Sequence, residues 1–97
     1  MESDDRTAAY SNTEFAPNWG DAIAAYLKEL RVKQEWTQEE LAHRSGYDAR
    51  YINMLERGRR NPSIRALVDL CQVFEVRPSA FLAEIERRLE PTAPLPD

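Results

Sequence analysis

The chain has 97 residues, a formal net charge of −4 at pH 7, one cysteine and one histidine. This length suits one small domain with short flanking segments. It has no run of about 18 apolar residues, and its N-terminus lacks the basic and apolar regions of a secretory signal, so we expect a cytoplasmic protein that spans no membrane. A lone cysteine and a lone histidine supply neither an internal disulfide nor a metal site, and we expect no metal or other cofactor.

The first helix follows a segment without helical periodicity. Residues 1–17 are expected to form a flexible N-terminal arm. Ile23, Leu27 and Leu30 recur at helical spacing and predict a helix from about residue 18 or 20 to residue 33. Within it, Glu29 and Lys33 have the spacing and order of a favourable ion pair.

A short second helix is predicted after Thr37. Thr37 and Glu40 have the spacing of a capping box, in which each side chain accepts a hydrogen bond from the other residue's amide. Trp36 and Leu41 flank the cap as a hydrophobic staple does. Gly46 stands where the helix must end, because glycine tolerates the positive φ of such an end.

A third helix follows the glycine turn. Asp48 is its expected cap, Ile52 and Leu55 are its inward face, and Gly58 ends it. Three arginines surround this glycine: Arg57, Arg59 and Arg60. Two short helices about a glycine turn, with polar groups exposed on the second, describe a helix-turn-helix.

Two more helices complete the predicted all-α, five-helix domain, which we place at residues 18–90. Ser63 caps the fourth, whose apolar stripe is Ile64, Leu67, Val68, Cys71 and Phe74. Pro78 fits the first turn of the fifth, whose apolar residues are Phe81, Leu82, Ile85 and Leu89. Residues 91–97 contain three prolines and are expected to form a disordered tail. Cys71 is interpreted as a core residue, and His43 as a surface residue.

Several segments together resemble a known family. They are Thr37–Ala42 (TQEELA), Gly46, Tyr51-Ile52, Leu55–Gly58 (LERG) and Asn61–Ser63 (NPS). Over roughly residues 20 to 86 the chain resembles the Cro and phage-repressor type of helix-turn-helix, also called the XRE family. The resemblance implies a lambda-repressor-like fold, a sequence-specific regulator of transcription such as a repressor, and a homodimer on a two-fold double-stranded DNA operator. Phage repressors, antitoxins and restriction–modification controllers remain alternatives within it.

The expected base contacts lie on the third helix. The side chains facing away from its buried side are Ala49, Arg50, Asn53, Met54 and Arg57. By resemblance, the first four occupy positions at which the family reads bases. Arg50 has the chemistry to pair with guanine and Asn53 with adenine, whereas Ala49 and Met54 offer only apolar contact.

Phosphate contacts are expected from side chains that flank this helix, namely Gln38, Arg59, Arg60 and Asn61. Tyr51 could reach phosphate or pack against the turn. Residues 31–65 hold eight basic and five acidic side chains, a local charge of +3, while the rest of the chain carries five against twelve. Positive charge is thus concentrated at the predicted DNA face. The resemblance also implies a structural ion pair between Arg31 and Glu56.

The predicted dimer interface is the last helix, through Phe81, Ile85 or Leu89, because its apolar stripe runs past what a small core needs. An alternative function is a protein-interaction module of antitoxin or anti-regulator type with an unidentified protein partner. The acidic flanks and Ala49 motivate it. The sequence presents no nucleophile–base set, phosphate loop or metal ligands, so we expect no enzyme.

Overall fold

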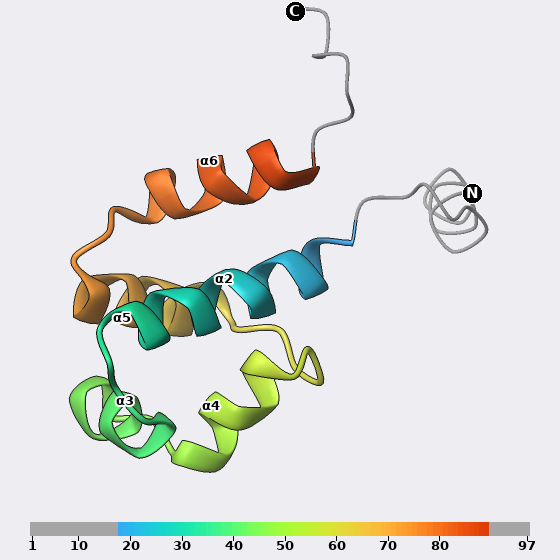
Figure 1. Cartoon of the computed structure of the whole chain (residues 1–97). Helices are drawn as coiled ribbons and strands as arrows, with labels where there is room; N and C mark the ends of the chain where they lie inside the picture. The colour runs from blue at the N-terminus through green and yellow to red at the C-terminus, as the bar shows by residue number, and fades with distance from the viewer. Residues whose placement is uncertain (1–17, 90–97) are drawn as a thin grey trace, which may run out of the picture.

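Residues 18–89 are described by the computed structural model, and they form five α-helices and no strand (Figure 1). The helices are α2 (Trp19–Lys33), α3 (Gln38–Ser45), α4 (Ala49–Glu56), α5 (Ile64–Phe74) and α6 (Pro78–Leu89). The five-helix, all-α fold expected from the sequence is confirmed. The predicted arm, residues 1–17, and the predicted tail, residues 91–97, lie outside the described residues.

Side-chain caps begin three of the helices where the sequence predicts them. Thr37, Asp48 and Ser63 each accept a hydrogen bond of 3.0 Å from an amide two or three residues further on. The second half of the expected capping box was wrong, because the Glu40 carboxylate pairs with Arg44 at 2.8 Å. A charged partner one turn along the helix replaces the amide of Thr37.

The helix ends show two kinds of turn. Gly46 ends α3 at φ 80° and Gly58 follows α4 at φ 72°, both in the left-handed region that glycine favours. Glu35 and Glu75 adopt φ values of 64° and 59° after α2 and α5. Only the first pair was foreseeable, because glutamate carries no sequence signal for a left-handed turn.

The core lies where all five helices meet. In Figure 1 α3 and α4 form the lower end, α2 and α5 cross the middle, and α6 covers the top. The most deeply buried side chains are Leu27, Leu41, Ile52, Leu55, Leu70, Cys71, Phe81 and Ile85. α4 packs against α2 and α3 packs against α5, and these contacts fix the outer face of the two short helices.

The apolar stripes of α5 and α6 are rotated from their predicted positions. Ile64 is 78% exposed and Val68 and Leu82 are each 39% exposed, although all three were expected in the stripes. Ala66 and Leu70 are buried in their place on α5. The buried arc of α5 is centred between residues 67 and 70, so Val68 lies on the far side of the helix.

One further expectation about α2 was wrong. Glu29 pairs with Arg88 of α6, through contacts of 2.6 and 2.9 Å, rather than with Lys33. Arg88 also lies 4.6 Å from the ring centre of Tyr26. A guanidinium that binds both carboxylate oxygens and covers an aromatic ring outcompetes the single ammonium of lysine.

Candidate nucleic-acid interface

The outward face of α4 is set by its inward face. Ile52 and Leu55 are 1% and 2% exposed and anchor α4 in the core. Because both lie on one side of the helix, its other side faces out. Of the predicted base-contacting residues, Arg50 is exposed there and Asn53 and Met54 are half-buried, while Ala49 lies at the edge of this face and packs against the core. The structure brings these four side chains together on one helix, as the sequence predicts.

A chain of hydrogen bonds ties α4 to α2 and α3. The Arg31 guanidinium binds the Glu56 carboxylate through Nε–Oε2 at 2.6 Å and Nη2–Oε1 at 2.9 Å. Gln38 Nε2 donates to Glu56 Oε1 at 3.0 Å, and Asn53 Nδ2 donates to Gln38 Oε1 at 3.2 Å. Arg31 Nη1 also donates to the carbonyl oxygen of Trp36 at 2.7 Å. The expected ion pair is thus the centre of a larger network.

This network changes the roles expected of two side chains. Gln38 was expected at phosphate, yet both ends of its amide are engaged inside the protein. Asn53 donates one of its two amide hydrogens to Gln38, which leaves its second amide hydrogen and its side-chain oxygen for other hydrogen bonds. Hydrogen bonds to Glu56 raise the pKa of Arg31 above its ordinary value, so the guanidinium stays charged. Local sequence carries no signal for the link between Gln38 and Asn53, which are 15 residues apart.

The segment after α4 presents a group of cations. We call residues 57–61 the arginine loop, and its members Arg57, Arg59, Arg60 and Asn61 are all exposed. The amide of Arg59 donates to the carbonyl of Met54 at 2.9 Å, which folds the loop back on the end of α4. Among residues 18–89 no carboxylate pairs with an arginine of this loop. The loop therefore offers charge to an outside anion.

Tyr51 packs against its neighbours. Its ring lies 5.4 Å from that of Tyr47, centre to centre, and the Arg60 guanidinium lies 5.5 Å from its ring centre. Tyr51 was expected either to reach phosphate or to pack against the turn, and its contact with Tyr47 is of the second kind. The ring in turn supports Arg60 through a cation–π contact.

The turn between α3 and α4 is tied to α5 by a pair that the sequence did not predict. The Tyr47 hydroxyl donates to Asp69 Oδ2 at 2.7 Å, and Arg65 Nε donates to Asp69 Oδ1 at 3.1 Å. The hydrogen bond from Tyr47 is the main cause that lowers the pKa of Asp69, and the same bond raises the pKa of Tyr47. The position of Tyr47 beside the glycine of the turn was the only sequence signal for this contact. It does not identify the partner, because Asp69 lies 22 residues away.

The residues expected at the dimer interface occupy different environments. Phe81 and Ile85 have no exposed surface, and Phe81 packs on the Tyr26 ring at 4.8 Å between ring centres. Leu89 is half-buried. Because α6 packs against both α2 and α5, most of its apolar stripe is buried against these helices. Of the three, only Leu89 keeps surface for a second copy.

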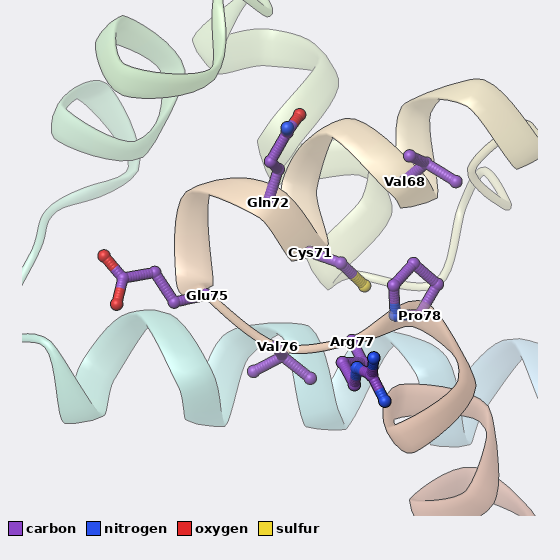
Figure 2. A pocket seen from close by; sticks show the side chains of 7 residues that line it. All are labelled: Val68, Cys71, Gln72, Glu75, Val76, Arg77 and Pro78. Atoms are coloured by element: carbon purple, nitrogen blue, oxygen red, sulfur yellow. The ribbon is translucent and has the colours of Figure 1, made fainter.

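A hollow of about 310 Å³ opens away from α4 (Figure 2). It lies between the second half of α5 and the connection to α6, and is lined by Val68, Cys71, Gln72, Glu75, Val76, Arg77 and Pro78. Cys71 is fully buried at this hollow, and burial raises the pKa of its thiol. His43 is exposed on α3. No cluster of metal-ligating side chains and no helix that could cross a membrane occurs within residues 18–89.

The sequence and the fold of this chain match those of known proteins. A helix-turn-helix family model (HTH_3) matches residues 27–81. The chain belongs to this family, the XRE type of helix-turn-helix. Over 54 residues it is 41% identical to an uncharacterised helix-turn-helix transcriptional regulator, y4dJ, of Sinorhizobium fredii, covering 56% of this chain and 70% of the relative.

Solved structures give the same result. The clp gene regulator ClgR of Corynebacterium glutamicum has a TM-score of 0.69 and 29% identity, covering 75% of this chain and 78% of that one. The restriction–modification controller protein C.AhdI of Aeromonas hydrophila has a TM-score of 0.60 and 33% identity, covering 63% and 92% respectively. This helix-turn-helix chain is therefore a transcription regulator of the DNA-binding class, not an enzyme.

Proposed function

We propose that this regulator binds a specific double-stranded DNA sequence as a two-fold dimer, with α4 in the major groove of each half-site. The observation that carries the proposal is the charge of the face formed by α4 and the arginine loop. Residues 49–61 contain four arginines and one acidic residue, Glu56. The Glu56 side chain is 3% exposed and bound to Arg31, so its charge is neutralised behind the face. Since its target is the cell's DNA, we place it in the cytoplasm.

Base reading falls to the first turns of α4. Helices of this motif place their N-terminal residues at base edges. Arg50 is exposed and suited to a guanine, and Asn53 keeps a free donor and acceptor for an adenine. Ala49 and Met54 add apolar contact. Because the hydrogen-bond network holds α4 against α2 and α3, these side chains are positioned before DNA arrives.

Phosphate contact falls to the arginine loop. Arg59, Arg60 and Asn61 are exposed beside the start of α5, and Arg57 extends the same charge toward α4. Such contacts fix the protein's register on the duplex without reading its sequence. The free backbone amides at the start of α3 are suited to bind a DNA phosphate as well. The Gln38 side chain belongs to the internal hydrogen-bond network.

The second copy is proposed to bind at an exposed apolar strip. Ile64 and Val68 lie one turn apart on α5, and Pro78 and Leu82 lie one turn apart on α6. Val68 and Pro78 both line the hollow, and we propose that the four residues act as one surface, which we call the α5–α6 strip. Three of the five exposed large apolar side chains among the described residues lie on it. Large exposed apolar patches mark interaction sites.

The test is DNA binding across a salt series. The full chain is titrated onto a duplex from the region upstream of its own gene and onto a random duplex of equal length, with fluorescence anisotropy as the readout. We expect tight binding to the first, and weaker, more salt-sensitive binding to the second. Equally feeble binding to both duplexes would contradict the proposal and favour a module that binds another protein.

A further inference from the structure

The first turn of α2 is packed against the arginine loop. The Asn61 Oδ1 atom lies 3.0 Å from the position that a Cβ on Gly20 would take, and Asp21 Oδ1 lies 3.3 Å from the corresponding position at Gly58. Asn18 caps this turn, accepting from the Asp21 amide at 3.0 Å and donating to its carboxylate at 2.9 Å. The point where residues 1–17 join the domain is thus held beside the loop.

Residues 1–17 carry a net charge opposite in sign to that of the arginine loop. Residues 1–17 contain four acidic side chains, Glu2, Asp4, Asp5 and Glu14, and one basic side chain, Arg6, for a net charge of −3. The loop and α4 together carry four arginines against the single, internally paired Glu56. Seventeen residues reach up to about 3.3 Å each when extended, so the acidic residues can span the loop from this attachment point.

We propose that the acidic segment 1–17 docks on the arginine loop and competes there with DNA phosphates. A tethered segment acts at an effective concentration near the millimolar range, so weak carboxylate–guanidinium contacts are enough to compete. The inference rests on the proposed function, because it assigns an internal competitor to the same surface. Its occupant is this chain's own N-terminal segment, placed by the charge and by the position of Asn18.

The competition has a distinctive salt dependence. Added salt weakens the contact between the segment and the arginines as well as the contact with DNA, so relief of the competition offsets part of the loss of DNA binding. Removing charge from the segment should therefore strengthen DNA binding at low salt and steepen its salt dependence. The gain should be the same on specific and random duplexes, because both use the phosphate contacts. At high salt the curves should converge, because both contacts are screened.

The experiment compares two variants of the full chain with equal net charge. Asp4→Asn with Asp5→Asn removes two charges from the segment. The matched control, Glu35→Gln with Glu86→Gln, removes two charges from exposed residues that have no partner among the described ones. Anisotropy titrations run from about 50 to 300 mM salt. We expect the segment variant to bind both duplexes about three- to tenfold more tightly at low salt, and the control variant to change much less.

A second readout needs no DNA. Amide NMR spectra of the unbound chain and of the segment variant should differ at residues 57–61 and at the start of α4. Unmoved loop signals, or shifts confined to the α5–α6 strip, would overturn the proposal. Equal tightening by both variants would do so too, because general repulsion would then explain it. If the loop signals move but no chain binds DNA, the docking stands and the proposed function fails.

Discussion

The Arg31 guanidinium bonds the Glu56 carboxylate at 2.6 Å and links α2 to the end of α4. The two side chains are only 12% and 3% exposed, and Gln38 extends the contact to Asn53. This pair therefore holds α4 in place, and it also neutralises a negative charge behind the proposed DNA face.

Glu56→Ala should destabilise the domain strongly. It leaves the Arg31 charge largely buried without a partner, and such a loss costs about 3 kcal/mol or more in the free energy of unfolding. Glu56→Gln should cost less, because its oxygen still accepts. The control is Glu40→Ala, which breaks the exposed pair with Arg44 and should cost about 0.5 kcal/mol. Urea unfolding measures all three, and equal losses at residues 56 and 40 would contradict the argument.

Arg50→Ala and Arg59→Ala should separate base reading from phosphate contact. Arg50→Ala is expected to weaken specific binding by about 1–3 kcal/mol and to relax the preference at one position per half-site. Arg59→Ala should weaken all duplexes alike and reduce the salt slope by roughly one per site. Anisotropy on specific and random duplexes measures both. An equal loss on the two duplexes for Arg50→Ala would refute its base-reading role.

Charge on the α5–α6 strip should break the proposed dimer. Val68→Glu or Leu82→Glu would place a carboxylate in the proposed contact, so sedimentation at tens of micromolar should shift from dimer to monomer. Val32→Glu is the control, because Val32 is 53% exposed on α2 and lies off the strip. If the unaltered chain is already a monomer under these conditions, the strip has another occupant.

Two left-handed positions should respond in opposite directions. Gly46 has φ 80° and open space around its Cβ position, so Gly46→Ala should cost about 1 kcal/mol through backbone strain alone, and Gly46→Asn less. Glu75 has φ 59° without being glycine, so Glu75→Gly should stabilise by about 0.5 kcal/mol. Thermal unfolding tests both, and a loss on Glu75→Gly would show that its side chain stabilises the fold.

The ionisation of Glu84 should make the stability of the fold depend on pH in the acid range. Hydrogen bonds from Arg87 and Arg88 lower its pKa from 4.5 to about 2. A lowered pKa means that the folded chain binds fewer protons than the unfolded chain, so this stabilisation is full above pH 4.5 and is lost as the pH falls toward 2. The gap in melting temperature between the unaltered chain and Glu84→Gln should close over that window. Glu86→Gln is the control, and a gap that persists at the acid end would contradict the assignment.

The sequence by itself determined the helices and the outward face of α4. Thr37, Asp48 and Ser63 cap their helices by accepting from amides within three residues. Each cap and its partner therefore lie in one short stretch of sequence, where the pattern can be recognised. Gly46 marks its turn for the same local reason. Ile52 and Leu55 fixed the inward face of α4, and with it the outward position of Arg50.

Only the tertiary structure decided how α5 and α6 are rotated and which charges pair. Several rotations of an apolar helix satisfy its periodicity, and packing against the neighbouring helices selected the ones that bury Leu70 and Phe81 and expose Val68 and Leu82. Arg88 reaches Glu29 across 59 residues. Gln38 donates to Glu56, 18 residues away, in a contact of the same long-range kind. These choices depend on neighbours distant in the chain, so no local pattern specifies them.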